Sequence, residues 1–309
     1  MTEEITDAAA TTALISGNIA QPVLPLTEQL MYSTVRLFNE TGNDLHWGTG
    51  FLFNLFNVAS HQVPVIVTNK HVAEDMGDDC TLTFTGRRPD GGPDLINHIT
   101  VQITQFKQAW IPHPDVDVVI LPVGPFLTEL QNKARLPYFV TLDQSLIPTG
   151  EELKALLPVE QVLTVGFPGR LWDDTHNLPV FHRGFTASAP YIDFKGERKF
   201  LIDITTWPGA SGSPVVLYNE GSWMQRDGNT QMGGVRLKLL GIATQVAVFD
   251  VRGNVTIQAA PTQVVLPSSM SVPTNLGVCI RAETVLEFEP MLVKKAIVAL
   301  PPGYVMRAK

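Results

Sequence analysis

The stretch DITTWPGASGSPVV, residues 203–216, decides the fold that we expect for this chain. A short run typical of a β-strand leads into a turn rich in proline and glycine, and a second apolar run follows it. The turn presents Ser211, and Gly209 allows the backbone there to adopt geometry that a Cβ atom would hinder. Taken alone, a Gly-Ala-Ser-Gly-Ser segment is usually only a turn. Its interpretation therefore depends on the segments that precede it.

Two earlier segments change that interpretation. In VIVTNKHVAEDM (65–76) a strand ends and His71 starts a short predicted helix, and in HPDVDVVILPV (113–123) Asp117 enters an apolar strand. A histidine beside a strand or an aspartate before one is common and usually structural. Together, however, the segments supply a hydroxyl, a base and an acid that could orient the base, which is what nucleophilic catalysis by serine requires. The sequence therefore predicts serine chemistry.

The rest of the chain reads as short β-strands in two halves. Apolar, β-branched runs broken by Gly, Pro, Asn and Asp favour antiparallel meanders. Between the halves, helix-forming residues over 124–158 predict a connector, and 282–300 contains helical turns at its start. The predicted strands are 33–38, 50–56, 63–68, 98–104, 116–123, 162–168, 184–190, 200–206, 213–218, 237–250 and 255–260.

We expect an all-β fold of two six-stranded antiparallel β-barrels, with a short helical connector and a C-terminal helical piece. The expected boundaries follow the composition. They are an N-terminal arm or linker at 1–28, a first barrel at 29–125, the connector at 126–158, a second barrel at 159–290 and a C-terminal tail at 291–309.

Composition excludes several classes of protein. The 309 residues are 44% hydrophobic and carry a formal net charge of −8 without a run of basic residues, so a nucleic-acid partner is not expected. No apolar stretch reaches the length of a membrane span, and the acidic N-terminus does not resemble a signal peptide, so we expect a cytoplasmic protein. Cys80 and Cys279 favour two free thiols, although one disulfide stays possible. The oligomeric state is left open.

The three segments, quoted as TNKHVA, DVVIL and PGASGSP, resemble the trypsin-like serine peptidases of the chymotrypsin fold, especially the bacterial HtrA/Deg-like branch. The order His, Asp, Ser is the order of that fold. GTGFL (48–52), VGFPG (165–169), GFTASA (184–189) and LLGIATQ (239–245) agree with it, so the resemblance covers about residues 30–290. It implies a serine endopeptidase that acts on protein or peptide substrates without a cofactor or metal.

The resemblance also implies a role for each site residue. Ser211 would be the nucleophile, His71 the general base and then acid, and Asp117 the group that holds the imidazole tautomer. The N–H groups of Gly209 and Ser211 would form the oxyanion hole. Asp115 is a rival for the orienting role, but the apolar run VVIL directly after Asp117 favours the latter.

Two departures from the family pattern bear on regulation, and the expected S1 pocket bears on substrate specificity. Ala210 stands where zymogen-type members have an aspartate, so activation by N-terminal cleavage is not expected, and about 20 residues after the second barrel are too few for a PDZ domain. The resemblance places the S1 pocket at a set of uncharged residues, which predicts a small or medium apolar P1 residue. These residues are Thr205, Thr244, Gln245 and Val246.

Three other classes of protein compete with a serine peptidase. An α/β-hydrolase needs G-x-S-x-G and a histidine after the serine, whereas Ser213 ends the motif here and all histidines precede Ser211. A metal site at His176 and His182, with Asp173 and Asp174 nearby, fits no usual ligand spacing. A catalytically silent trypsin-fold scaffold is the remaining alternative, and labelling of Ser211 distinguishes it from an enzyme.

Overall fold

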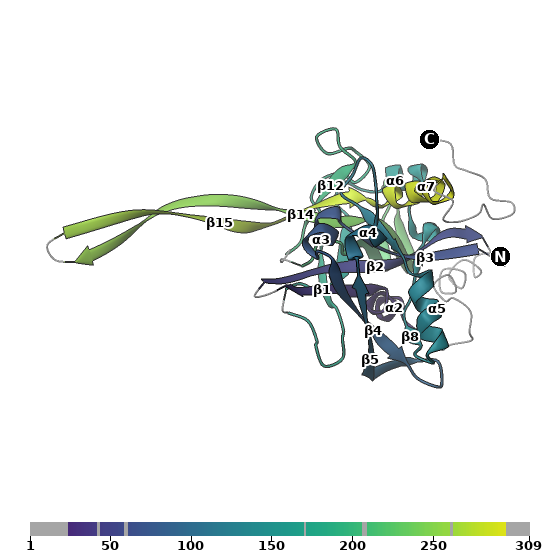
Figure 1. Ribbon diagram of the computed structural model, residues 1–309. Coiled ribbons are helices and arrows are strands. Elements are labelled where there is room, and N and C mark those ends of the chain that lie inside the picture. Colours follow the sequence, from purple (N-terminus) through teal and green to yellow (C-terminus); the bar gives the residue numbers. More distant parts are fainter. Residues whose placement is uncertain are drawn as a thin grey trace.

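The computed structural model describes residues 24–41, 44–58, 61–169, 171–205, 209–259 and 262–294. Within these ranges the chain forms two antiparallel β units joined by a connector with short helices (Figure 1). This confirms the all-β fold expected from the sequence. The described residues contain no helix that is long and apolar enough to cross a membrane.

The first unit is a nine-stranded sheet whose main path runs β5-β4-β1-β2-β3-β7-β6, with β8 beside β4 and β9 beside β2. Six strands were expected, and the difference arises because β6, β8 and β9 are only two residues long, too short to leave a periodic pattern in the sequence. The strands are β1 (Thr34–Thr41), β2 (Asp44–Val58), β3 (His61–Thr68), β4 (Asp79–Arg87), β5 (Pro93–Thr104), β6 (Ile111–Pro112), β7 (Val119–Pro122), β8 (Pro137–Tyr138) and β9 (Leu142–Asp143).

The second unit is a closed barrel in the order β10-β11-β12-β15-β14-β13, and all its pairs are antiparallel. Within the barrel itself, closure removes the exposed edges that an open sheet would present. Its six strands are β10 (Gln161–Gly166), β11 (Val180–Thr186), β12 (Lys199–Asp203), β13 (Pro214–Met224), β14 (Thr230–Ala259) and β15 (Thr262–Arg281).

Short helices occupy the connections. The connector carries α5 and α6, and Thr149 starts α6 with a capping box in which its hydroxyl accepts from Glu152 N while the Glu152 carboxylate accepts from Thr149 N. After the second barrel, η2 and α7 form the expected helical piece. The helices are α2 (Leu26–Met31), α3 (Lys70–Asp75), α4 (Phe106–Ala109), α5 (Gly124–Asn132), η1 (Gln144–Leu146), α6 (Gly150–Ala155), η2 (Ala282–Glu287) and α7 (Phe288–Lys294).

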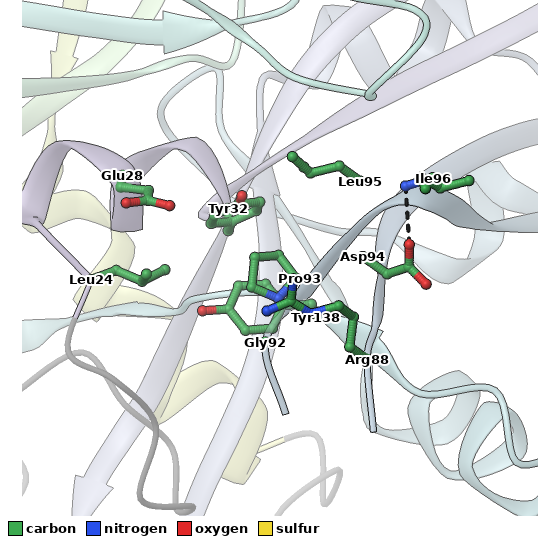
Figure 2. A pocket seen from close by; sticks show the side chains of 10 residues that line it. All are labelled: Leu24, Glu28, Tyr32, Arg88, Gly92, Pro93, Asp94, Leu95, Ile96 and Tyr138. Carbon is green, nitrogen blue, oxygen red and sulfur yellow. Dashed lines mark hydrogen bonds between the residues drawn. The ribbon is translucent and has the colours of Figure 1, made fainter. Parts of the chain in front are cut away.

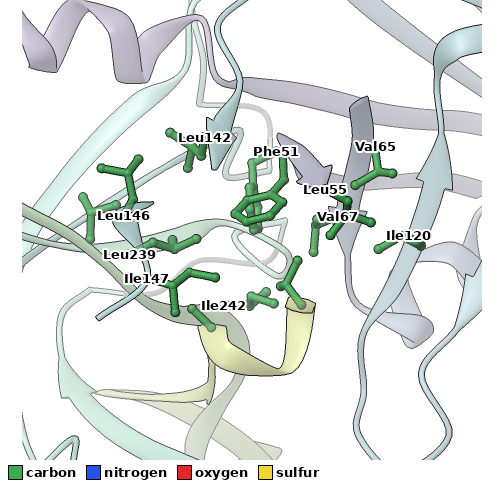
Figure 3. Packing of buried hydrophobic residues seen from close by; sticks show 14 of the residues in the cluster. Phe51, Leu55, Val65, Val67, Ile120, Leu142, Leu146, Ile147, Leu239 and Ile242 are labelled. Carbon is green, nitrogen blue, oxygen red and sulfur yellow. The ribbon is translucent and has the colours of Figure 1, made fainter. Parts of the chain in front are cut away.

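One continuous apolar core joins the two units (Figure 3). On β2, Phe51 and Phe53 face this core, while Leu52 on the opposite face belongs to the separate core of the first unit. Alternation along a strand explains why the run GFLFNLF has no polar face: both faces of β2 are covered. Leu239 and Ile242 meet this core from the second barrel. The units are therefore packed together, and the residues at their junction are held in place from both sides.

Strands β14 and β15 extend far beyond the barrel. They form a two-stranded ribbon that projects from the body of the molecule, coloured green in Figure 1. The pairing continues from Val248↔Pro273 to Ala259↔Thr262 without a further register shift. The sequence predicted two separate strands in the β14 region, at 237–250 and 255–260, whereas the structure joins them into one strand.

Candidate active site

His71 lies in α3, directly after Lys70, as the sequence predicted for a short helix. The helix begins after Asn69, which is fully buried and whose Nδ2 donates to the main-chain oxygen of Asp117 at 2.8 Å. This hydrogen bond ties the start of the helix to the segment that leads into β7. Residues 48 positions apart in the sequence are thereby brought side by side.

The carboxylate of Asp117 orients His71. The distance between His71 Nδ1 and Asp117 Oδ2 is 2.8 Å, and His71 N donates to Oδ1 at 3.2 Å. The Thr244 hydroxyl also donates to Oδ2, at 2.6 Å. Nδ1 is engaged by Asp117, whereas Nε2 has no partner among the described residues. Nε2 is therefore the ring nitrogen that can exchange a proton with a third group. Asp115, the rival residue, is exposed and makes no such contact.

The pair has shifted pKa values. The hydrogen bond that His71 donates to Asp117 raises the pKa of His71, and this effect outweighs the opposing effect of burial. For Asp117, burial alone would raise the pKa, but hydrogen bonds from His71 and Thr244 outweigh it and lower the pKa below its usual range. Asp117 is thus an anion at neutral pH, where it accepts hydrogen bonds and favours the protonated imidazole.

Ser211 lies in the turn between β12 and β13, next to Thr244. Its hydroxyl donates to the main-chain oxygen of Thr244 at 3.2 Å and makes no hydrogen bond with His71. The turn itself is bonded to β14, because Gly212 N donates to Ala243 O at 2.8 Å and Ala243 N donates to Ser213 O at 2.9 Å. Thr244 therefore touches Asp117 through its hydroxyl and Ser211 through its carbonyl.

Thr49 fastens the serine turn to the first unit. Its hydroxyl donates to Gly209 O at 2.9 Å and accepts from Phe167 N at 2.9 Å, while its own N–H donates to Ser211 O at 3.1 Å. The Thr68 hydroxyl donates to Thr49 O at 2.7 Å. Thr49 is fully buried, so these bonds are shielded from water and fix the turn between the two units.

The two N–H groups predicted to form an oxyanion hole have no acceptor among the described residues. Gly209 has φ +94°, and a Cβ atom there would lie 2.5 Å from Trp47 Cδ1 and 2.7 Å from Gly169 N. Only glycine fits this position. Ser211 follows two residues later and is half-buried, so its N–H and that of Gly209 lie in the same short turn.

The residues expected to line the S1 pocket differ in their environment. Thr205 and Gln245 are exposed and Val246 is half-buried, so all three are available to a ligand. Thr244 is buried, and its hydroxyl is taken up by Asp117. Two sets of contacts were not predicted from the sequence. They are the hydrogen bond from Thr244 to Asp117, and the hydrogen bonds by which Thr49 holds the serine turn. The only signal for Thr49 was its place within GTGFL, because hydrogen bonds across the unit junction leave no local pattern.

His176, one of the two histidines of the alternative metal site, makes a local contact within its loop. His176 Nδ1 lies 2.8 Å from Asp173 Oδ2, and both side chains are exposed. His182 lies on β11 without a partner of this kind, and burial lowers its pKa. Across the described parts of the chain, no three His, Cys, Asp or Glu side chains gather as metal ligands would.

A pocket of about 380 Å³ lies in the first unit, and none of the predicted site residues lines it (Figure 2). Tyr32 and Tyr138 meet there edge to face, with ring centroids 4.9 Å apart, and burial raises the pKa of Tyr32 to about 12. Arg88 and Glu28 add opposite charges to the lining. The pocket is thus separate from the His71–Asp117–Thr244–Ser211 arrangement.

Comparison with solved structures finds proteases of low sequence identity. A serine endoprotease from Yersinia pestis is 13% identical with a TM-score of 0.44; the alignment covers 87% of this chain and 66%, just under two thirds, of that chain. The catalytically active tobacco etch virus protease in complex with product is 14% identical (TM-score 0.42), with 92% and 87% covered. A thermostable serine protease from an extremophilic microorganism is 10% identical (TM-score 0.43), with 83% and 94% covered.

Among curated proteins, no relative matches the sequence. The model of the trypsin-like peptidase domain matches residues 48–224, a range that contains His71, Asp117 and Ser211. The assignment rests on this match, because the structural similarities have TM-scores below 0.5. Since the match covers more than half of the chain, the protein belongs to the trypsin-like peptidase family.

Proposed function

We propose that this protein is a serine endopeptidase that cleaves protein or peptide bonds through an acyl-enzyme, with Ser211, His71 and Asp117 as its catalytic triad. The observation that carries the proposal is the hydrogen bond of 2.8 Å between His71 and Asp117, linked through Thr244 to Ser211. The three residues come from separate turns and a helix start at the junction of the two units, where the shared core holds them.

In this mechanism the Ser211 hydroxyl first leaves the Thr244 carbonyl and turns toward His71 Nε2. The Ser211 oxygen then attacks the substrate carbonyl carbon while His71 takes the hydroxyl proton. The N–H groups of Gly209 and Ser211 would stabilise the oxyanion. His71 next gives its proton to the leaving amine as the C–N bond breaks, which leaves an ester on Ser211. Water, deprotonated by His71, hydrolyses this ester and restores the serine.

Activity is expected to rise with pH through the pKa of His71, because only the neutral imidazole can accept the proton. The Asp117 hydrogen bond raises that pKa, so the midpoint should lie above the ordinary value of about 6.5. The measurement is kcat/KM for a peptide between pH 5 and 9, together with an NMR titration of the His71 ring. Activity that increased on acidification would contradict the role of His71.

Covalent labelling of Ser211 tests the proposal directly. Intact-mass spectrometry after treatment with a fluorophosphonate is expected to show one adduct on the wild type and none on Ser211→Ala or His71→Ala. Ser222→Ala, which removes an exposed serine on β13, is the matched control and should label normally. Folded wild-type protein without an adduct would favour the catalytically silent scaffold instead.

The finer assignments are part of the same proposal. A small or medium apolar P1 residue is supported by the uncharged set Thr205, Thr244, Gln245 and Val246, and rapid cleavage after Arg in a peptide library would contradict it. Placement in the HtrA/Deg-like branch rests on the sequence motifs and stays a prediction.

A further inference from the structure

A second histidine, His113, lies buried in the loop that carries Asp117. The loop comprises residues 113–118 and joins Pro112 at the end of β6 to Val119 at the start of β7, which are paired partners. The His113 ring packs edge to face against Phe288 of α7, with ring centroids 5.5 Å apart. The proposed mechanism uses Asp117 and gives no role to this buried titratable group.

The Nδ1 atom of His113 folds the loop. It accepts hydrogen bonds from two main-chain N–H groups, those of Asp115 at 3.1 Å and Val116 at 3.3 Å. The main chain adds two further bonds, from His113 N to Val118 O at 2.9 Å and from Val118 N to Val116 O at 2.8 Å. Asp117 stands between the two valines, so the direction of its side chain depends on how this loop is folded.

The other ring nitrogen of His113 is held by the second unit. Because Nδ1 accepts from N–H groups, the neutral ring carries its proton on Nε2. Nε2 donates to Glu287 Oε2 at 3.0 Å, and the other carboxylate oxygen of Glu287 accepts from Arg198. Glu287 ends η2, and Arg198 directly precedes β12. The carboxylate therefore fixes both the orientation of the ring and the tautomer in which Nδ1 is an acceptor.

We propose that His113 is a positioning residue for Asp117, whose loop it holds folded through the unprotonated Nδ1 atom of its neutral ring. The proposal rests on the proposed function, in which Asp117 orients His71. His113 acts at one remove from the chemistry, because it contacts the loop of Asp117 and not the reacting groups. Protonation of His113 is then a second way to switch the site off, distinct from protonation of His71.

A proton on Nδ1 would point at the two loop N–H groups and leave them without their acceptor. The charged groups that face the ring are Glu287 and Asp115, which favour its protonation, and Arg198, which opposes it. Burial opposes protonation most strongly, so the pKa of His113 is lowered from its ordinary value, whereas that of His71 is raised. The loop is therefore folded at neutral pH and should loosen only at a pH below the titration of His71.

The pH profile of kcat/KM provides the first test. On acidification, the slope of log kcat/KM against pH is expected to be about one below the pKa of His71 and about two below that of His113. In His113→Asn the slope should stay at about one. His182→Gln, which removes a half-buried histidine of β11 whose pKa is also lowered by burial, should keep the wild-type profile. Near-UV circular dichroism at each pH verifies the fold.

A slope that stays at about one in the wild type, or that still reaches about two in His113→Asn, would overturn the proposal.

Two amide substitutions separate the roles of the two ring nitrogens. In His113→Asn the side-chain oxygen takes the place of Nδ1 and can accept from the loop, whereas in His113→Gln the amide nitrogen takes the place of Nε2 and only the bond to Glu287 can be kept. The Asn variant is expected to keep kcat within about threefold of the wild type, and the Gln variant to lose about 100-fold in kcat with little change in KM. Equal losses would mean that the ring only fills space.

NMR of the histidine rings tests the proposal without turnover. At pH 7, His113 should carry a proton on Nε2 and none on Nδ1. In His113→Gln the pKa of His71 should fall toward its ordinary value of about 6.5, because Asp117 is no longer held against it, and in His113→Asn it should stay raised. The opposite tautomer, or an unchanged His71 pKa in the Gln variant, would contradict the role of His113.

This readout also separates the two proposals. A chain that cleaves no peptide, but in which the pKa of His71 responds to the two substitutions as expected, would refute the proposed function and leave the positioning of Asp117 by His113 supported.

Discussion

An Asp117→Asn variant is expected to lose about 10⁴-fold in kcat while keeping its fold. The amide replaces a carboxylate that accepts from His71 Nδ1, His71 N and the Thr244 hydroxyl. An amide NH₂ group in this place cannot accept the Nδ1–H bond, so it favours the tautomer in which Nε2 carries the proton and cannot take one from Ser211. The measurement is steady-state peptide cleavage, with near-UV circular dichroism to verify the fold.

The matched control is Asp115→Asn, which removes an exposed carboxylate two residues away and should leave kcat within about twofold. The NMR titration adds a second readout. Loss of the Asp117 charge removes the main cause of the raised pKa of His71, so the midpoint should move down. Equal losses of activity in the two variants would contradict the orienting role of Asp117.

Gly212→Ala is expected to lower the free energy of unfolding by about 3–5 kcal/mol and to abolish labelling of Ser211. Gly212 is buried with φ +85°, and a Cβ atom there would lie 1.9 Å from Thr49 O and 2.2 Å from Thr68 Oγ1. The turn would have to move away from Thr49, which is the residue that fastens it to the first unit. Chemical denaturation and intact-mass labelling are the two measurements.

Gly221→Ala provides the control. Gly221 has nearly the same φ, +84°, but nothing lies within 4 Å of the added Cβ atom. Its substitution therefore isolates the cost of the left-handed backbone, about 1–2 kcal/mol, and should leave labelling unchanged. If the two alanine variants were equally stable and equally reactive, the close packing of the serine turn would not be needed for the site.

The sequence was most informative where the chemistry is local. The segments around His71, Asp117 and Ser211 each combine a strand end with a turn or helix start, and such signals lie within a few residues. The continuous apolar run of β2 likewise predicted a strand, because both of its faces are buried. The all-β fold in two halves could therefore be predicted from these patterns.

Features that depend on long-range strand pairing could not be predicted from the sequence. Strand β15 contains Pro267 and Pro273, which normally argue against a strand, but proline is tolerated on edge strands. Arg252, Gly253 and Asn254 read as a break in β14, yet the register pairs them with Ser269, Ser268 and Pro267.

Contacts between distant parts of the sequence also explain why some residues of the candidate active site were not predicted. Thr244 and Thr49 act through hydrogen bonds to residues 127 and 160 positions away, which no local pattern encodes.

The two cysteine thiols allow the opening of each β unit to be measured separately. Cys80 on β4 and Cys279 on β15 are both fully buried and unpaired, and burial raises the pKa of both, that of Cys80 to about 12. A thiol reagent can react only after the surrounding strands have opened. Because one cysteine belongs to each unit, their separate rates of alkylation report how often each unit opens. Equal rates would mean that the shared core makes the two units open as one.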